Sequence, residues 1–562
     1  MYLGIDLGTT NSVVARSFVD VNNHLITEVI KIGQYDKNDN WTEESTKLPS
    51  MVYFTPNEII VGEKAKDQRG QDREHVVTNA KRFIGTHHTW TIDDQNYEAT
   101  DISAIVLQHC KRELEHRNLK YDSVVITVPA SFTPDQSKYT VAAAVKAGFR
   151  EDQVTIKHEP TAALLSYIDE QSRRREVDRE VDFSKRTRVL VFDLGGGTCD
   201  TAIIDVTIDR NRIQFEELGI GRYKELGGID FDARLADKLL DEFFKANNIY
   251  EGKLTRAQKD EMYRRLLLGA ETIKELLTAR INSKRMHDPL CDPNAVEVRY
   301  NIPDFYDGNP LNLSISKQKY DEYTKDLYID KKATSRRHED VDRDKNVISI
   351  IRETLEEFHI DKDSIDYVFM TGGMTKFPTV QEKIFEYVGK PLLKPADPMN
   401  AVAVGAAVYQ YYNPNEDGTV MTGFDEPKIT IDDQMTLSES IMLNVSEGLP
   451  HVIIPKGTVV PYSGELRGMF RTASTSGVNL NIYAGIDPFD SSMRIQQTLK
   501  QKFKSPVNLD TPFDIRYSID ENKSITMSIT IDDGYHEPQE LELSIYGNEN
   551  IAEQDYNIKQ DD

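Results

Sequence analysis

Two different patterns of apolar and polar positions follow one another along the chain. Up to about residue 412, short apolar runs alternate with longer segments of helical periodicity. The runs at 123–128 (SVVITV) and 188–193 (RVLVFD) have the length and β-branched content of buried strands. Within 230–247, the residues Phe231, Leu235 and Leu239 recur at four-residue spacing. This spacing predicts a helix with one apolar face, and the alternation as a whole predicts an α/β domain.

Beyond residue 412, alternation with a period of two residues dominates, for example in VNLNIYAGI from 478 and FDIRYSI from 513. Polar turn formers separate these runs, and no long helical pattern interrupts them. The pattern predicts an antiparallel β-sandwich. The predicted organisation is an α/β domain, a linker, a β-sandwich domain and a polar tail, at residues 1–412, 413–432, 433–548 and 549–562.

Composition narrows the class of protein. The 562 residues carry 68 basic and 93 acidic side chains, a net charge of −25, which argues against nucleic acid or an anionic membrane as a partner. No apolar run approaches the ~18 residues of a membrane span. The three cysteines are widely separated, which argues against a disulfide scaffold and a CxxC zinc site. The first residues lack the pattern of a secretory signal, so we expect a cytoplasmic protein.

Two glycine-rich turns resemble each other and carry the candidate chemistry. They are GIDLGTTNS at 4–12 and VFDLGGGTCD at 191–200. A third glycine-rich element is TGGMTKFP at 371–378. Glycine allows close approach of the backbone to a polyanion, and amide groups in such turns form anion-binding concavities. Asp6 and Asp193 precede the turns and would repel phosphate unless a divalent cation such as Mg²⁺ lies between them. The two turns therefore predict two similar lobes around one metal–nucleotide complex.

Longer motifs resemble the heat shock protein 70 (DnaK-type) chaperone family. The chain is similar to that family in NAKRFIG at 79–85, HEPTAALLSY at 158–167 and LGGIDFDARL at 226–235, besides the glycine turns. The resemblance implies a two-lobed, actin-like (ribonuclease H-like) ATPase domain followed by the β-sandwich. It also implies ATP or ADP, Mg²⁺ and K⁺ as ligands.

The resemblance further implies roles for individual residues. The implied catalytic residues are Lys81, Glu159, Asp193 and Thr198. The implied metal-site residues, acting mostly through water, are Asp6, Asp193 and Asp200. The implied nucleotide contacts are Gly8, Thr9, Thr10, Asn11, Gly195, Gly196, Gly197, Thr198, Gly227, Gly228, Glu271, Lys274, Thr278, Gly372, Gly373, Met374 and Lys376.

The chain also departs from the family's pattern. The arginine that follows the family's switch proline falls at Ser137, and Glu275 stands where an arginine or aliphatic group often faces adenine. In the linker, Ile429 and Ile431 are separated by a polar residue, so we expect a weakened docking strand and weakened coupling between the domains. No helical lid follows the sandwich, so we expect fast exchange of bound peptide.

Three functional hypotheses follow. The first is an ATP-dependent chaperone that hydrolyses ATP and binds extended apolar peptides in the sandwich, served by a J-domain co-chaperone and a nucleotide exchange factor. The second is an ATP-gated binding module or co-chaperone with one dedicated partner. The third is a sugar kinase or filament former of the actin-like superfamily, against which the HEPTAA motif and the sandwich argue.

Overall fold

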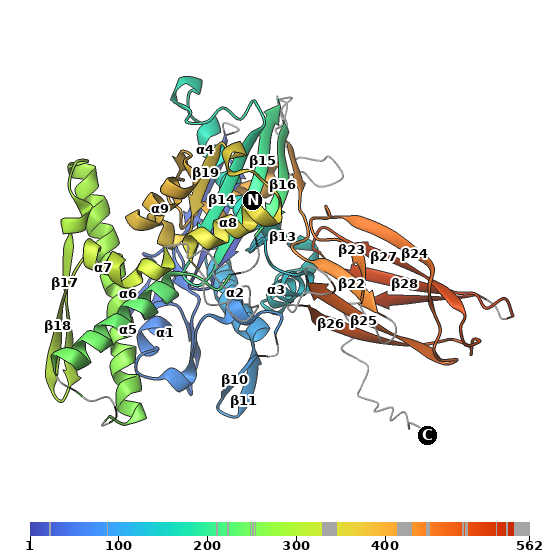
Figure 1. Cartoon of the computed structure of the whole chain (residues 1–562), viewed down its shortest axis with the longest axis horizontal. Helices are drawn as coiled ribbons and strands as arrows, with labels where there is room; N and C mark the ends of the chain where they lie inside the picture. Colours follow the sequence, from blue (N-terminus) through green and yellow to red (C-terminus); the bar gives the residue numbers. More distant parts are fainter. Residues whose placement is uncertain are drawn as a thin grey trace. The chain divides into compact units, whose positions relative to one another are not determined.

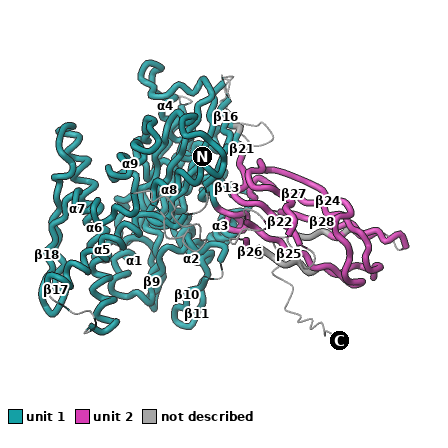
Figure 2. The backbone as a smooth tube through the Cα atoms, viewed as in Figure 1, with its two compact units in different colours: residues 1–131, 139–433 teal, residues 132–138, 434–562 magenta. Residues whose placement is uncertain are grey.

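The computed structural model describes two compact units (Figure 2). Unit 1 comprises residues 1–131 and 139–433, and unit 2 comprises residues 132–138 and 434–562. The described residues are 1–21, 24–86, 88–209, 212–221, 224–247, 249, 252, 254–328, 346–412, 430–444, 450–485, 488, 493–523, 525–535 and 538–544. These ranges exclude the predicted tail at 549–562 and most of the linker. They also exclude nearly all of segment 330–346, whose sequence is rich in charged residues.

The first lobe of unit 1 is built on a mixed sheet with the strand order β13-β12-β1-β2-β3, and β6 pairs with β2. Strand β1 runs parallel to β12 and antiparallel to β2, so the turn between β1 and β2 lies at the carboxyl end of β1. The strands are β1 (Tyr2–Leu7), β2 (Asn11–Val19), β3 (Leu25–Ile30), β6 (Leu48–Pro49), β12 (Ser123–Val128) and β13 (Val154–His158).

The second lobe repeats this arrangement with the order β20-β19-β14-β15-β16-β21. Strand β14, labelled with β15 and β19 in Figure 1, runs parallel to β19 and antiparallel to β15. Strand β1 pairs in the same way with β12 and β2. The strands are β14 (Thr187–Leu194), β15 (Cys199–Asp209), β16 (Arg212–Ile220), β19 (Tyr367–Thr371), β20 (Leu392–Leu393) and β21 (Thr430–Gln434). The repeat confirms the predicted two-lobed α/β fold, because each glycine-rich turn joins the same pair of strands in its own lobe.

Helices α4 (Glu159–Ser172) and α10 (Ala401–Tyr412) pack closely on one another and on the first sheet. Two glycines make this approach possible. A Cβ atom at Gly405 would lie 1.6 Å from the carbonyl oxygen of Ala162, and one at Gly4 would lie 2.2 Å from the nitrogen of Ala407. Atoms cannot approach so closely, so both positions require glycine, and α10 packs directly on α4 and on β1.

The other elements of unit 1 cover the sheets and extend the lobes. Helix α5 carries the predicted apolar face, with Phe231, Leu235 and Leu239 buried. The helices are α1 (Glu63–Gln68), α2 (Ala99–His116), α5 (Gly228–Ala246), α6 (Arg256–His287), α7 (Lys317–Thr324), α8 (Val347–Glu357) and α9 (Pro378–Val388). The short strands are β4 (Gln34–Tyr35), β5 (Trp41–Thr42), β7 (Val52–Phe54), β8 (Ile59–Val61), β9 (Val76–Val77), β10 (Thr89–Ile92) and β11 (Gln95–Glu98), and β17 (Glu297–Tyr306) pairs with β18 (Asn309–Ser316).

Strand β21 lies where the sequence predicted a weakened docking strand. It pairs with the edge strand β16 of the second lobe, and Ile431 packs against the apolar core there. The Lys157 ammonium lies 3.1 Å from Asp433 Oδ2, and both side chains are almost fully buried. The chain thus docks this segment with a buried ion pair in addition to apolar contact, a pairing that the linker sequence alone did not reveal.

Unit 2 is the predicted sandwich of two antiparallel sheets, with strand orders β23-β22-β25-β26 and β24-β27-β28-β29. Alternate residues of the strands form its core, as the period of two predicted. The strands are β22 (Ser440–Asn444), β23 (His451–Ile454), β24 (Tyr462–Arg471), β25 (Gly477–Gly485), β26 (Arg494–Lys502), β27 (Pro512–Ile519), β28 (Ile525–Ile531) and β29 (Gln539–Ser544).

Residues 132–138 belong to unit 2, although the sequence prediction assigned them to the first domain. The carbonyl oxygen of Phe132 accepts hydrogen bonds from Ser438 Oγ and Lys523 Nζ, each at 3.3 Å. These bonds group the segment with the sandwich. Helix α3 (Pro134–Lys146) begins in this segment.

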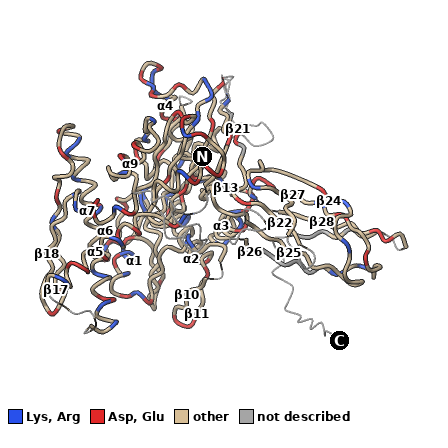
Figure 3. Tube along the Cα trace, viewed as in Figure 1, with Lys and Arg blue, Asp and Glu red and all other residues tan. Residues whose placement is uncertain are grey.

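Charged residues of both signs are interspersed along the described chain (Figure 3). None of the helices in the described ranges combines the length and the apolar character needed to cross a membrane.

Candidate active site

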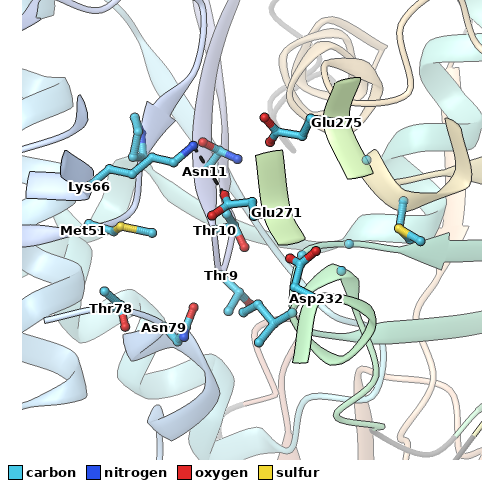
Figure 4. A pocket seen from close by; sticks show the side chains of 18 of the residues that line it. Thr9, Thr10, Asn11, Met51, Lys66, Thr78, Asn79, Asp232, Glu271 and Glu275 are labelled. Carbon is cyan, nitrogen blue, oxygen red and sulfur yellow. Dashed lines mark ion pairs between the residues drawn. The ribbon is translucent and has the colours of Figure 1, made fainter. Parts of the chain in front are cut away.

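A cleft of about 1240 Å³ lies in unit 1 and is lined by residues of both lobes (Figure 4). It is large enough for a nucleotide with its water shell. Most of the predicted site residues line it: Asp6, Gly8, Thr9, Thr10, Asn11, Lys81, Glu159, Asp193, Gly195, Gly196, Thr198, Gly228, Glu271, Lys274, Thr278, Gly372, Gly373, Met374 and Lys376.

The two glycine-rich turns meet inside this cleft. A Cβ atom at Gly196 would lie 1.9 Å from Thr10 Oγ1, so the second turn touches the first and leaves no space for a side chain. The second turn is tied to the start of α5, since the amide nitrogen of Gly228 donates to the carbonyl oxygen of Gly195 at 3.0 Å. The cleft therefore brings backbone amides from both lobes together, which suits a phosphate chain.

Carboxylates gather beside the turns. Asp6 is the second-to-last residue of β1, and Glu159 is the first residue of α4. Asp193 and Asp200 are paired across β14 and β15. Burial, followed by the negative charge of Glu159, raises the pKa of Asp6 to about 7 and that of Asp200 also to about 7. The same two causes raise the pKa of Asp193. The cluster is therefore short of positive charge.

Lys81 supplies positive charge at the centre of this cluster. Its Nζ lies 2.5 Å from Glu159 Oε1, and both side chains are buried. Burial alone would lower the pKa of Lys81, but the attraction of Glu159, Asp6 and Asp200 outweighs burial and raises the pKa. Lys81 is therefore a fixed cation, suited to a phosphate oxygen.

The residues fit a hydrated divalent cation. All the donors are carboxylate oxygens, which Mg²⁺ prefers, and the raised pKa values show that the carboxylates lack a counter-charge. No group of three or more His, Cys, Asp or Glu side chains within the described ranges is arranged to ligate one ion directly.

Polar atoms without partners also fit a ligand. Thr10 Oγ1 and Asp232 Oδ1 are buried side-chain atoms of residues that line the cleft, and in the described part of the chain neither has a hydrogen-bond partner. Buried polar atoms normally have partners, so a bound molecule or water would satisfy these two.

Two of the implied nucleotide contacts, Glu271 and Lys274, lie on α6 and already have protein partners. Lys274 Nζ donates to Asp232 Oδ2 at 2.6 Å and to the carbonyl oxygen of Gly228 at 3.0 Å. Glu271 pairs with Arg69 and, at 3.4 Å, with Lys66, as Figure 4 shows for Lys66. These pairs lower the pKa of Glu271 although burial opposes them, so it stays ionised and can accept hydrogen bonds from sugar hydroxyls.

Three predicted residues do not line the cleft. A Cβ atom at Gly227 would lie 2.4 Å from the nitrogen of Gly197, so Gly227 packs directly against the backbone of the second turn. Asp200 Oδ1 accepts a hydrogen bond from Ser131 Oγ at 2.5 Å. These three residues support the turn and the carboxylate cluster from outside the cleft.

Some residues of the site were missed by the sequence analysis. Lys66 and Arg69 reach Glu271 from the first lobe, and Asp232 pairs with Lys274. Arg82 donates to the carbonyl oxygen of Gly197 and so ties the first lobe to the second turn. Arg82 and Asp232 had a local signal, because Arg82 directly follows Lys81 in the quoted NAKRFIG motif and Asp232 lies within the quoted LGGIDFDARL motif.

Comparison with known proteins agrees with this geometry. A family model described as "Hsp70 protein" matches residues 2–490. The chain is 28% identical over 560 residues to "Chaperone protein DnaK" of Thermosipho africanus, covering 99% of this chain and 81% of the relative. It is 30% identical over 466 residues to "Chaperone protein DnaK" of Thermotoga petrophila, covering 82% of this chain and 66% of the relative. The chain therefore belongs to the Hsp70 family of ATP-dependent chaperones, whose members are ATPases.

Proposed function

We propose that the cleft binds Mg-ATP and that Lys81, Glu159, Asp193 and Thr198 catalyse transfer of its terminal phosphoryl group to water. The observation that carries this proposal is the buried Lys81–Glu159 pair, set among aspartates beside two touching glycine turns. Phosphoryl transfer to water needs positioning and neutralisation of charge more than covalent chemistry.

Each group has a distinct task in this proposal. The turn amides and Lys81 hold the phosphate oxygens, and Thr198 orients the terminal phosphate or the attacking water. Asp6 and Asp193, with Asp200 behind them, hold hydrated Mg²⁺, which neutralises phosphate charge. Glu159 accepts a hydrogen bond from a water and, through its bond to Lys81, keeps that water and the lysine in register. A K⁺ ion beside the acidic cluster is part of the same proposal.

We expect Mg-ATP to raise the melting temperature of unit 1. At a ligand concentration 100 times the Kd, binding stabilises the folded state by about 2.7 kcal/mol. Differential scanning calorimetry of the full chain with ATP, ADP and no nucleotide, each with Mg²⁺, measures the shift. AMP with Mg²⁺ serves as the control, since it lacks the terminal phosphates that the two turns would hold. No shift with either ATP or ADP would contradict the site.

The second part of the proposed function is peptide binding by unit 2. Antiparallel sheets with alternating side chains can hold an extended peptide by strand addition and pockets for alternate residues. Membership of the Hsp70 family supports this mode, together with a J-domain co-chaperone, a nucleotide exchange factor and a cytoplasmic location.

The test is steady-state ATP hydrolysis by the full chain with a panel of unrelated apolar peptides. We expect several peptides to raise the turnover rate, because family members couple the two domains. Highly charged peptides of equal length serve as controls. Turnover that no apolar peptide changes would contradict general chaperoning and would indicate an ATP-gated module with one dedicated partner.

A further inference from the structure

Three consecutive residues connect the start of α4 to three separate parts of unit 1. Lys157 pairs with Asp433 of β21, His158 with Glu217 of β16, and Glu159 with Lys81 of the first lobe. All three side chains are buried. Lys157 and His158 are the last residues of β13, and the neighbouring strand β12 holds them in register. A shift in any one of these pairs is therefore passed to the next residue along the backbone.

The middle pair has the most enclosed environment. The side chains of His158 and Glu217 are both 0% exposed, and His158 Nδ1 lies 2.7 Å from Glu217 Oε1. The hydroxyl Oγ1 of Thr161, in the first turn of α4, donates to the same oxygen at 3.0 Å. Glu217 thus accepts hydrogen bonds from His158, which precedes Glu159 in the sequence, and from Thr161, which follows it. Because water does not reach this oxygen, the position of these bonds is set by the protein alone.

The pair also joins the two lobes. His158 ends β13 in the first sheet and is the N-cap residue of α4, whereas Glu217 lies in β16 of the second sheet. Glu159 is the first residue of α4, and its carboxylate extends into the cleft to Lys81. The backbone that carries Glu159 is therefore anchored to the second lobe through one carboxylate oxygen.

We propose that His158 is a positioning residue for ATP hydrolysis. Its imidazole, held by Glu217, fixes the first turn of α4 and thereby the direction of the Glu159 carboxylate toward Lys81 and the attacking water. This inference rests on the proposed ATPase function. It assigns a role in the chemical step to a group that does not line the cleft.

The experiment is single-turnover hydrolysis of Mg-ATP by the full chain, with ATP affinity measured separately. We expect His158→Ala to lower the hydrolysis rate about 10–100-fold, the range seen when an orienting partner of a site residue is lost. The Kd for ATP should change little, since His158 does not touch the cleft. His158→Asn should recover most of the rate, because its Nδ2 stands where His158 Nδ1 donates. His158→Ala with Glu217→Ala should be no slower than the slower single variant, because either single substitution already removes the bond between His158 and Glu217.

Tyr412→Phe is the matched control. Tyr412 Oη donates to Asp169 Oδ1 at 2.9 Å, a buried bond at the other end of the same helix. We expect this variant to melt earlier but to hydrolyse ATP at the wild-type rate. If His158→Ala does not fold, the double variant His158→Leu with Glu217→Leu replaces it, because removing both partners leaves no buried charge unpaired.

The outcomes separate this inference from the proposed function. A wild-type chain without hydrolysis would end the proposed function itself. A wild-type chain that hydrolyses ATP, with His158→Ala or the double leucine variant within threefold of its rate, would overturn the positioning role alone. A loss of rate that Tyr412→Phe reproduces would also overturn it, because the effect would then follow the stability of α4.

Discussion

Replacing Lys81 by alanine is expected to lower the rate of ATP hydrolysis about 10²–10³-fold, the loss typical when one group that stabilises a transition-state charge is removed. Lys81 is the cation that lies buried among Glu159, Asp6 and Asp200, as the causes of its raised pKa show. Without the Lys81 ammonium, the carboxylates would repel the terminal phosphate and the negative charge that develops as water attacks it. Single-turnover hydrolysis measures the loss, and calorimetry with Mg-ADP measures whether nucleotide still binds.

Lys64→Ala is the control for this substitution. Lys64 lies on the neighbouring helix α1, pairs with Asp39 at 2.9 Å and does not line the cleft. We expect its hydrolysis rate to match the wild type, because Lys64 pairs with the largely exposed Asp39 outside the cleft. A Lys81→Ala chain that hydrolyses ATP within threefold of the wild-type rate would remove Lys81 from the catalytic set.

The parts of the site that the sequence predicted are those set by local structure. Asp6 and Asp193 are each the second-to-last residue of a strand, and the glycine-rich turn begins two residues later, so position along the chain determines position in space. The repeated pattern also predicted the pseudo-symmetric lobes, since similar strand–turn–strand segments form similar hairpins. The period of two predicted the sandwich for the same reason: a strand has only two faces.

The parts that the sequence did not predict depend on contacts between distant segments. The Glu271 pairs with Lys66 and Arg69 join helices about two hundred positions apart, and no periodicity records them. Gly227 was predicted to touch nucleotide, but a glycine that touches a ligand and one that packs on another backbone look alike in sequence. His158 was read only as part of the HEPTAA motif, because its partner Glu217 lies in another sheet.

The linker strand illustrates the same limit. Its weak apolar pattern predicted weak docking, yet the strand pairs with β16 and buries an ion pair with Lys157. The centroid of the Tyr409 ring lies 4.4 Å from the Lys157 ammonium. Burial lowers the pKa of Lys157, but the negative charge of Asp433 opposes burial, and the pKa is raised. Docking therefore depends on charge supplied from more than two hundred residues away, which a search for apolar runs cannot detect.

Asp433→Ala is expected to detach β21 from the edge of unit 1. Removing one partner of a buried ion pair typically costs about 3–5 kcal/mol, since the remaining charge is left without compensation. Lys157 would then lose the carboxylate that offsets its burial, and the strand can reduce this cost by leaving and admitting water. Hydrogen exchange measured by mass spectrometry should show loss of protection at 430–434, while protection in the central strand β14 stays unchanged.

Two further variants decide whether the ion pair causes this effect. Glu353→Ala breaks the more exposed pair with Lys224 and should leave exchange at β21 unchanged, because pairs at the surface contribute about 0–1 kcal/mol. The double variant Lys157→Met with Asp433→Leu should restore protection, since apolar side chains of similar size can replace a buried pair at little cost. If Asp433→Ala leaves β21 as protected as in the wild type, backbone pairing with β16 and the packing of Ile431 suffice to hold the strand. The apolar pattern of the linker would then be enough to account for its docking, and the buried pair would be secondary.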